Sequence, residues 1–198
     1  MKQGSSTKLL QRDPVIKGLI AKHQIKEYWG GQHDLFLDLI EIITGQQLSM
    51  KAAKSIFDRF LALYPKTPVP GDILATSDEK LRGIGLSGSK VKYVKNIAAA
   101  ISSDTLPLNQ LEKQTDEEVK NELLKIKGIG PWSAEMFLIF SLKRPDVFSV
   151  GDIGLRTAIE RLYGIKRDNL KAIEKLAESW RPHRTLACRL LWSSLEKI

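Results

Sequence analysis

The stretch 123–134 reads Leu-Leu-Lys-Ile-Lys-Gly-Ile-Gly-Pro-Trp-Ser-Ala and joins two segments of helical periodicity through a Gly-x-Gly turn. Glycine tolerates positive φ and leaves no side chain over the turn, so N–H groups of the turn and of the following helix can face an anion. Pro131 suits the first turn of that helix, and Ile129 can point inward and fix the turn. The stretch therefore predicts a helical hairpin that contacts one phosphate of a nucleic-acid backbone without reading its sequence.

The composition is that of a globular chain with a basic surplus. Hydrophobic residues make up 42% of the 198 residues and charged residues 27%, which suits one or two compact domains and argues against a disordered or fibrous chain. Lys and Arg number 31 against 23 Asp and Glu, and the net charge of +8 favours nucleic acid or an anionic membrane surface as a partner. Many basic proteins bind neither. No apolar run approaches the roughly 18 residues of a membrane span, so we expect no membrane segment.

The single cysteine and the histidines limit the metal chemistry. Cys188 alone excludes an intramolecular disulfide, a four-cysteine zinc site and a protein-ligated iron–sulfur cluster, and its apolar surroundings predict a buried side chain. His23, His33 and His183 lack metal-ligand spacing, so we expect no catalytic metal and no cofactor. The polar start of the chain lacks a signal-peptide core, which favours a cytoplasmic, nucleoid-associated protein or a nuclear one.

The apolar periodicity is helical almost throughout, and no segment shows the period of two that indicates a strand. Pro65, Pro68, Pro70 and Gly71 favour a loop. Helices are expected near 89–101, 153–163, 168–179 and 183–196. Others begin at a capping residue or a proline, namely Asp34, Ser49, Ser77, Thr115 with Glu118 in a capping box, and Pro131. The sequence predicts an all-α protein of about nine or ten helices.

A Pro- and Gly-containing loop over 143–151 ends in Asp152 at an expected helix start. An aspartate at that position caps the helix, and for an isolated residue the cap alone would explain it. Asp152 follows Trp132 of the hairpin by twenty residues, however, and this distance gives less weight to the interpretation as a cap alone.

The chain resembles the helix–hairpin–helix DNA glycosylase superfamily, and within it the 3-methyladenine DNA glycosylase II type of alkylation repair. The resemblance extends over roughly residues 14–196 and rests on the segments 45–49, 85–93, 128–134, 146–154 and 180–184 and on Trp192. It implies a two-lobed all-α fold with an active-site cleft between the lobes and without the N-terminal β domain of some members. One lobe would comprise residues 44–145, with the hairpin at 126–131, and the other residues 1–43 plus 146–198.

The resemblance also implies a chemistry. Asp152 would be the catalytic residue, either stabilising the oxocarbenium-like sugar or activating a water, and the sequence leaves both roles open. Bifunctional relatives have a Lys where this chain has Trp132, so the resemblance implies a monofunctional enzyme without lyase activity. The expected reaction is hydrolysis of the N-glycosidic bond of 3-methyladenine and 7-methylguanine in base excision repair. Such bases carry positive charge and are good leaving groups. The expected partner is double-stranded DNA with damaged bases, and we expect a monomer to bind it.

Two groups of side chains would serve the flipped base and the duplex. Aromatic faces bind a cationic base well. The residues expected in the base pocket are Trp132, Trp192, Met136, Phe36 and Tyr28. The alternative role for each of them is packing in the core. Residues 45–48, which we term the wedge loop, match the segment that fills the gap left by the base, with Gln47 or Leu48 as the wedge. The residues expected to contact DNA are Gln46, Gln47, Leu48, Ser49, Lys127, Gly128, Ile129, Gly130, Ser133, Arg181 and Arg184, the two arginines having a solvated surface as their alternative.

Hairpins of this family can also hold a monovalent cation through backbone carbonyls, which the sequence does not test.

Two other functions remain open at this point. One is a glycosylase for another lesion, such as a deaminated, etheno or mismatched base. The other is a non-catalytic helix–hairpin–helix DNA-binding protein, for which the hairpin would suffice but Asp152 would have no use.

Overall fold

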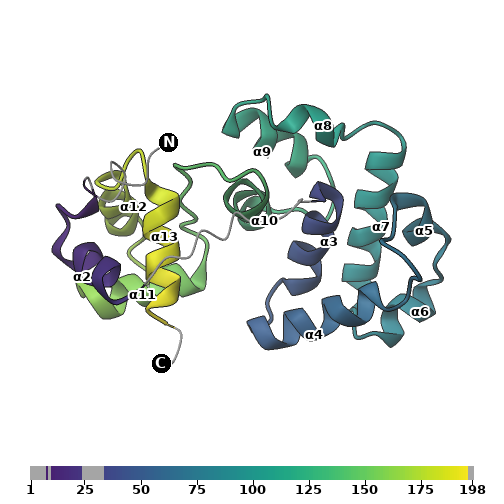
Figure 1. Ribbon diagram of the computed structural model, residues 1–198, viewed down its shortest axis with the longest axis horizontal. Helices are drawn as coiled ribbons and strands as arrows, with labels where there is room; N and C mark the ends of the chain where they lie inside the picture. Colours follow the sequence, from purple (N-terminus) through teal and green to yellow (C-terminus); the bar gives the residue numbers. More distant parts are fainter. Residues whose placement is uncertain (1–7, 9, 24–33, 196–198) are drawn as a thin grey trace. The chain divides into compact units, whose positions relative to one another are not determined.

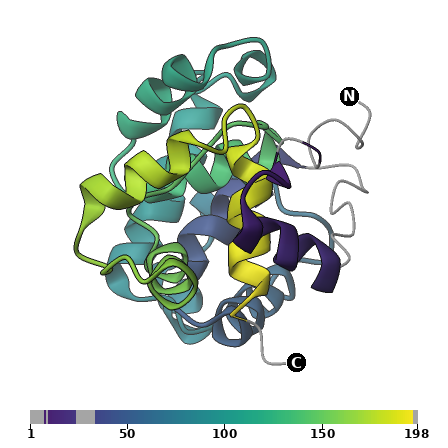
Figure 2. The same ribbon diagram turned by 90° about the vertical axis from the view of Figure 1, so that its left-hand side faces the viewer.

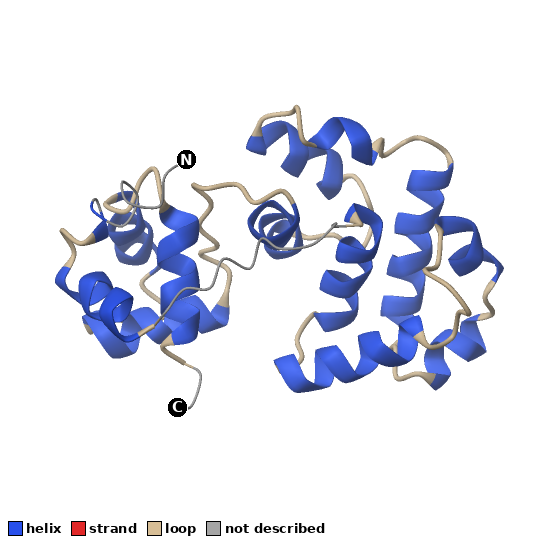
Figure 3. Ribbon diagram, viewed as in Figure 1, coloured by secondary structure: helices blue, strands red, loops and turns tan. Residues whose placement is uncertain are grey.

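The computed structural model describes residues 8, 10–23 and 34–195, and within these ranges all regular secondary structure is helical (Figure 3). The predicted all-α class is therefore confirmed. None of the helices in the described ranges has the length and apolar character to cross a membrane. Tyr28, one of the residues expected in the base pocket, lies outside the described residues.

The chain divides into two compact units, one formed by Met1–Gly31 with Lys143–Ile198 and the other by Gln32–Leu142. This corrects the expected lobe boundary after residue 43. Helix α3 (Leu35–Gly45) packs on α4 (Met50–Leu61) and α7 (Gly88–Ser102), because its apolar face is buried against them, and so it belongs to the second unit.

In the second unit α7 is the central helix. It packs against α3, α5 (Pro70–Ala75) and α6 (Asp78–Gly83) (Figure 1). Its buried side chains recur at helical spacing, namely Val91, Val94, Ile97 and Ala98. The unit is completed by α8 (Leu108–Leu111), α9 (Asp116–Leu124), α10 (Pro131–Met136) and a π-helical turn, η1 (Phe137–Ser141).

Capping side chains start the helices where the sequence predicted them. Each accepts a backbone N–H of the first turn, and Thr115 with Glu118 forms the expected capping box; the caps are Asp34, Ser49, Ser77 and Thr115. The loop expected through Gly71 is wrong at its end, because Pro70 occupies the first position of α5. The carboxylate of Asp72 accepts the N–H of Val69 at 2.9 Å and closes that helix start.

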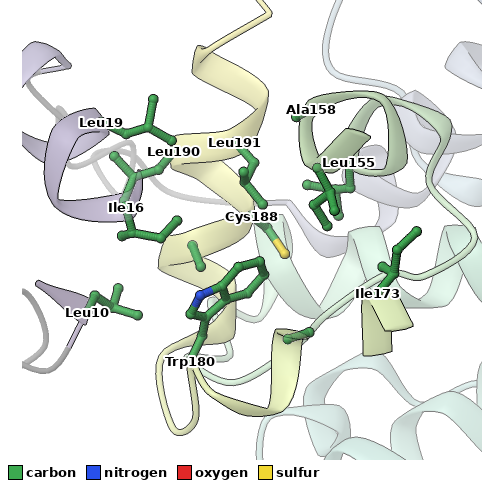
Figure 4. Close-up of a cluster of buried hydrophobic side chains, with 13 residues drawn as sticks. Leu10, Ile16, Leu19, Leu155, Ala158, Ile173, Trp180, Cys188, Leu190 and Leu191 are labelled. Carbon is green, nitrogen blue, oxygen red and sulfur yellow. The ribbon is translucent and has the colours of Figure 1, made fainter. Parts of the chain in front are cut away.

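The first unit contains α2 (Pro14–Lys22), which the sequence analysis did not anticipate, together with α11 (Ile153–Tyr163), α12 (Leu170–Glu178) and α13 (Arg184–Ser193). Helix α13 packs against α2 and α11 (Figures 1 and 2). The core of the unit surrounds α13, with Ile16 and Leu19 of α2 to one side of it and Leu155 of α11 to the other (Figure 4). Cys188 is fully buried in this core, as predicted.

Candidate active site and DNA-binding surface

Asp152 is the N-cap of α11 and its carboxylate is held by two N–H donors. Oδ1 accepts the backbone N–H of Leu155 at 2.7 Å and the indole Nε1–H of Trp192 at 2.9 Å. The first bond satisfies one of the donors that a helix start leaves without a partner. The second comes from α13, forty residues away along the chain, and it fixes the carboxylate against a second element.

Gly154 allows this approach. A Cβ at Gly154 would lie 3.0 Å from Oδ1 of Asp152 and 3.3 Å from Cδ1 of Trp192. The carboxylate and the indole therefore meet over a position that has no room for a side chain without a shift. Gly154 was not predicted as a site residue. It is the second residue of the helix that Asp152 caps, and a glycine at this position could have indicated close packing beside the carboxylate.

The loop that leads to Asp152 is fastened to the start of α13. Arg184 donates from Nε to Oδ1 of Asp146 at 2.8 Å and from Nη2 to the backbone oxygen of Asp146 at 2.6 Å. Thr185, which is buried, accepts the N–H of Val147 at 3.0 Å and donates to the carbonyl of Arg144 at 2.6 Å. The same helix thus holds both the loop and, through Trp192, the carboxylate that ends it.

The two arginines expected to contact DNA have acidic partners here. Arg184 also contacts Glu178 at 3.2 Å and its side chain is only 16% exposed, so it serves the loop rather than a surface. Arg181 pairs with Glu178 and Asp146 at 2.6 Å each, and its guanidinium lowers the pKa of Glu178 through a hydrogen bond. Arg181 is the more exposed of the two, with 49% of its side chain accessible.

The hairpin of the second unit joins α9 to α10. Gly128 has a φ of 116°, and a Cβ there would lie 2.3 Å from Cγ of Tyr93, so only glycine fits between the turn and α7. Ile129 is 5% exposed, which confirms that it points inward. Lys127 is exposed, and its carbonyl accepts a 2.8 Å hydrogen bond from Nδ2 of Asn96. Gly130 is the N-cap of α10.

The wedge loop lies between α3 and α4. Gln47 and Leu48 are exposed, Gln47 has a φ of 59°, and the exposed Ser49 caps α4. Gln46 has a different role from the one expected. Its Nε2 donates to the carbonyl of Gly128 at 3.1 Å and to Oγ of Ser133 at 2.8 Å. Ser133 is 1% exposed, so its hydroxyl has an internal partner in place of the expected DNA contact.

The residues expected in the base pocket differ in how much of each side chain is exposed. Trp132, in the second unit, and Trp192, in the first, are each partly exposed. Phe36 and Met136 are 5% and 4% exposed, which fits the alternative of core packing. Lys90, Tyr93 and Asn96 were not predicted as site residues, but their contacts with the wedge loop and the hairpin join residues far apart in the sequence.

No group of three potential metal-ligating side chains occurs within the described ranges. A pocket of about 420 Å³ lies in the first unit and is lined by Asp13, Tyr163 and Trp180 among others. None of the residues expected in the site lines it, and its polar groups bond to one another, since Oδ2 of Asp13 accepts from Tyr163 and Trp180.

The family model described as HhH-GPD superfamily base excision DNA repair protein matches residues 40–182, which include the hairpin, Asp152 and the loop between them. The chain belongs to this superfamily. Its HhH-GPD segment therefore spans parts of both units, and the helix–hairpin–helix resemblance read from the sequence is confirmed.

Relatives within the HhH-GPD superfamily are named for alkylation repair. DNA-3-methyladenine glycosylase 1 of Schizosaccharomyces pombe is 36% identical, over 79% of this chain and 71% of the relative. A Bacillus subtilis relative, YfjP, is 31% identical, and the chain spans 58% of its length.

Two solved structures share the fold. The S. pombe 3-methyladenine DNA glycosylase in complex with abasic DNA is 31% identical, with a TM-score of 0.90 over 97% of this chain and 96% of that one. The Bacillus halodurans DNA-3-methyladenine glycosidase is 34% identical, with a TM-score of 0.78 over 96% of this chain and 88% of that one.

Proposed function

We propose that this protein is a monofunctional DNA glycosylase that hydrolyses the N-glycosidic bond of alkylated purines such as 3-methyladenine and 7-methylguanine. The observation that carries the proposal is the carboxylate of Asp152, fixed by the Leu155 N–H and the Trp192 indole in a member of a base excision repair superfamily. The indole that holds Asp152 is partly exposed, whereas the indole of Trp180 that binds Asp13 is 1% exposed, so Asp152 is the carboxylate that can meet a substrate.

Cleavage of the N-glycosidic bond is favoured by a negative charge beside the sugar. Breaking the bond between the base and C1′ develops positive charge on the deoxyribose, as in glycoside hydrolysis. A carboxylate that is already oriented stabilises this charge without reorganising during the reaction. The two donors on Oδ1 of Asp152 supply that orientation, and water then adds to C1′ and leaves an abasic site.

The substrate class follows from charge. Alkylation at N3 of adenine or N7 of guanine makes the base cationic, so it departs as a neutral molecule and needs no strong general acid. The partly exposed indole of Trp192, which binds Asp152, offers an electron-rich face for such a base. Trp132 stands where lyase-competent relatives have a Lys, and an indole cannot form a Schiff base with the sugar.

DNA binding is assigned to the second unit. Gln47 and Leu48 of the wedge loop and Lys127 of the hairpin are exposed, and the protein has a net charge of +8. The similar S. pombe glycosylase was solved on abasic DNA, the product of base removal, which supports duplex DNA as the partner. One copy of the chain suffices for a lesion that has no symmetry.

The test compares base release by wild type and Asp152→Asn. Duplex DNA methylated on purines is incubated with each protein, and the released bases are separated by chromatography. We expect wild type to release methylated purines and leave uncut abasic strands, and Asp152→Asn to be slower by about 100-fold or more, since the isosteric amide lacks the charge. Binding to DNA with a tetrahydrofuran abasic analogue should be retained.

Two results would contradict the proposal. Equal release rates for the two proteins would remove Asp152 from the chemistry. No release of methylated purines by wild type, despite tight binding to the abasic analogue, would exclude the substrate class, and release assays on deaminated and etheno bases would follow.

A further inference from the structure

The wedge loop combines exposed side chains with an unfavourable backbone conformation. Gln47 has a φ of 59°, in the left-handed region that costs a residue with a Cβ about 1 kcal/mol or more. Both Gln47 and Leu48 are exposed, Leu48 by 41%. A conformation of this kind persists only where surrounding contacts determine it. The contacts that hold the loop therefore maintain this conformation.

Lys90, on α7, makes two of these contacts. Its Nζ donates hydrogen bonds of 2.8 Å to the carbonyl of Thr44 and of 2.8 Å to the carbonyl of Gln46. Thr44 lies in the last turn of α3, where carbonyls lack partners within the helix and where a cation interacts favourably with the helix dipole. Burial lowers the pKa of Lys90, and the two carbonyls replace part of the water that the ammonium loses.

Gln46 is held at its other end by the hairpin. Its backbone carbonyl binds Lys90, while its side-chain amide donates to Gly128 and Ser133. The residue that precedes Gln47 is thus fixed through both its main chain and its side chain. This fixes the wedge loop to the hairpin within one compact unit.

The same face of α7 also supports the hairpin. Lys90, Tyr93 and Asn96 are spaced by three residues and so lie on one side of the helix. Tyr93 packs under Gly128, and Asn96 donates to the carbonyl of Lys127. One face of α7 therefore holds both segments. Lys90 binds the wedge loop, and Tyr93 and Asn96 contact the hairpin.

We propose that Lys90 is a positioning residue for base extrusion, which fixes the wedge loop against the hairpin without touching the DNA. This inference rests on the proposed glycosylase function and names a residue that acts before bond cleavage. The hairpin can hold the DNA backbone without Lys90, because Tyr93 and Asn96 remain. Insertion of the wedge requires Gln47 and Leu48 to stay in place while a base is displaced, and this step depends on Lys90.

The experiment uses Lys90→Met, which removes the donors and keeps the length of the side chain, with Lys92→Met as the matched control. Lys92 is exposed on the same helix, and its replacement removes the same charge. Extrusion is measured by the fluorescence of 2-aminopurine placed next to a tetrahydrofuran abasic analogue, because emission rises when the stack opens. The release of 7-methylguanine is measured under single-turnover conditions with saturating protein.

We expect Lys90→Met to lose most of the fluorescence rise and to release base about tenfold more slowly, because two charge-assisted hydrogen bonds are gone. Its affinity for undamaged duplex should match that of Lys92→Met, which should keep the wild-type fluorescence and rate. Wild-type fluorescence in Lys90→Met would overturn the proposal, and so would an equal loss in Lys92→Met. If wild type opens the stack but releases no methylated base, the function above fails while the role of Lys90 stands.

Gln46→Met keeps the test decisive if Lys90→Met folds poorly. It removes the amide that binds Gly128 and Ser133 and leaves Lys90 intact. We expect the same loss of fluorescence with a thermal midpoint close to that of wild type. The double variant should lose little more than either single one, since both act on one loop. Fully additive losses would show two independent effects and would overturn the shared role.

Discussion

Two aspartates of the first unit have nearly the same local arrangement. Asp13 starts α2 and Asp152 starts α11, each accepts backbone N–H groups of its own helix, and each accepts the indole N–H of a tryptophan at 2.9 Å. The tryptophans are Trp180 for Asp13 and Trp192 for Asp152. A cap and an indole donor are thus not enough to mark a carboxylate as catalytic.

The surroundings separate the two sites. Trp180 is 1% exposed, and Oδ2 of Asp13 also accepts the hydroxyl of Tyr163 at 2.8 Å. Burial and the carboxylate of Asp13 raise the pKa of Tyr163, which keeps that phenol a donor. Asp152 instead precedes Ile153, which is 67% exposed, and its tryptophan is only partly buried. The Asp13 arrangement suits a fixed core, whereas that of Asp152 suits a carboxylate that meets a substrate.

The largest expected effect is on stability and belongs to Asp13. Asp13→Ala removes the cap of α2 and leaves the buried indole N–H of Trp180 without its acceptor, so we expect a loss of about 3 kcal/mol in the free energy of unfolding. Asp152→Ala removes a cap and the acceptor of an indole that is partly exposed and can bond to water, so it should lose about 1 kcal/mol. Urea denaturation of both variants measures the difference. Equal losses would show that the two carboxylates have the same structural role.

The tryptophans should separate stability from activity. Trp192→Phe removes the donor to Oδ1 of Asp152 and keeps an aromatic face, so we expect single-turnover base release to fall about tenfold. Trp180→Phe removes the corresponding donor to Asp13 and should lower the unfolding midpoint while the folded fraction keeps its rate. A rate in Trp192→Phe equal to that of wild type would show that the indole does not orient the carboxylate.

Much of the fold could be predicted because its signals are local. A cap acts on N–H groups two or three residues away, so Asp34, Thr115 with Glu118, and Asp152 could be assigned from sequence alone. The hairpin was predictable for the same reason, since the glycines and the inward-pointing Ile129 lie within three residues. Pro70 begins α5, but the sequence predicts a loop there because a proline is found in loops as well as in the first turn of a helix.

The contacts that position the site were not predictable, because they join distant parts of the chain. Gln46 and Gly128 are 82 residues apart, and Asp152 and Trp192 are 40 apart. A glutamine in a loop that is expected to contact DNA gives no sign that its amide bonds to a carbonyl of another loop. The sequence predicts a DNA contact or a solvated surface for Arg184, and it cannot predict the bond to Asp146, which lies 38 residues before it.

The smallest expected effect compares two glycines, one in each helix that an aspartate caps. Gly18 lies within α2 with nothing within 4 Å of an added Cβ, so Gly18→Ala should stabilise the protein by about 0.5–1 kcal/mol and leave base release unchanged. Gly154→Ala gains the same helical preference, but its Cβ would press on Oδ1 of Asp152 and on the Trp192 ring. We expect its rate to fall a few-fold with little change in thermal midpoint, because a small displacement of a catalytic group costs rate. Single-turnover assays beside thermal unfolding measure both. If Gly154→Ala behaved like Gly18→Ala in both assays, the close packing of the Asp152 carboxylate and the Trp192 indole over Gly154 would have no part in catalysis.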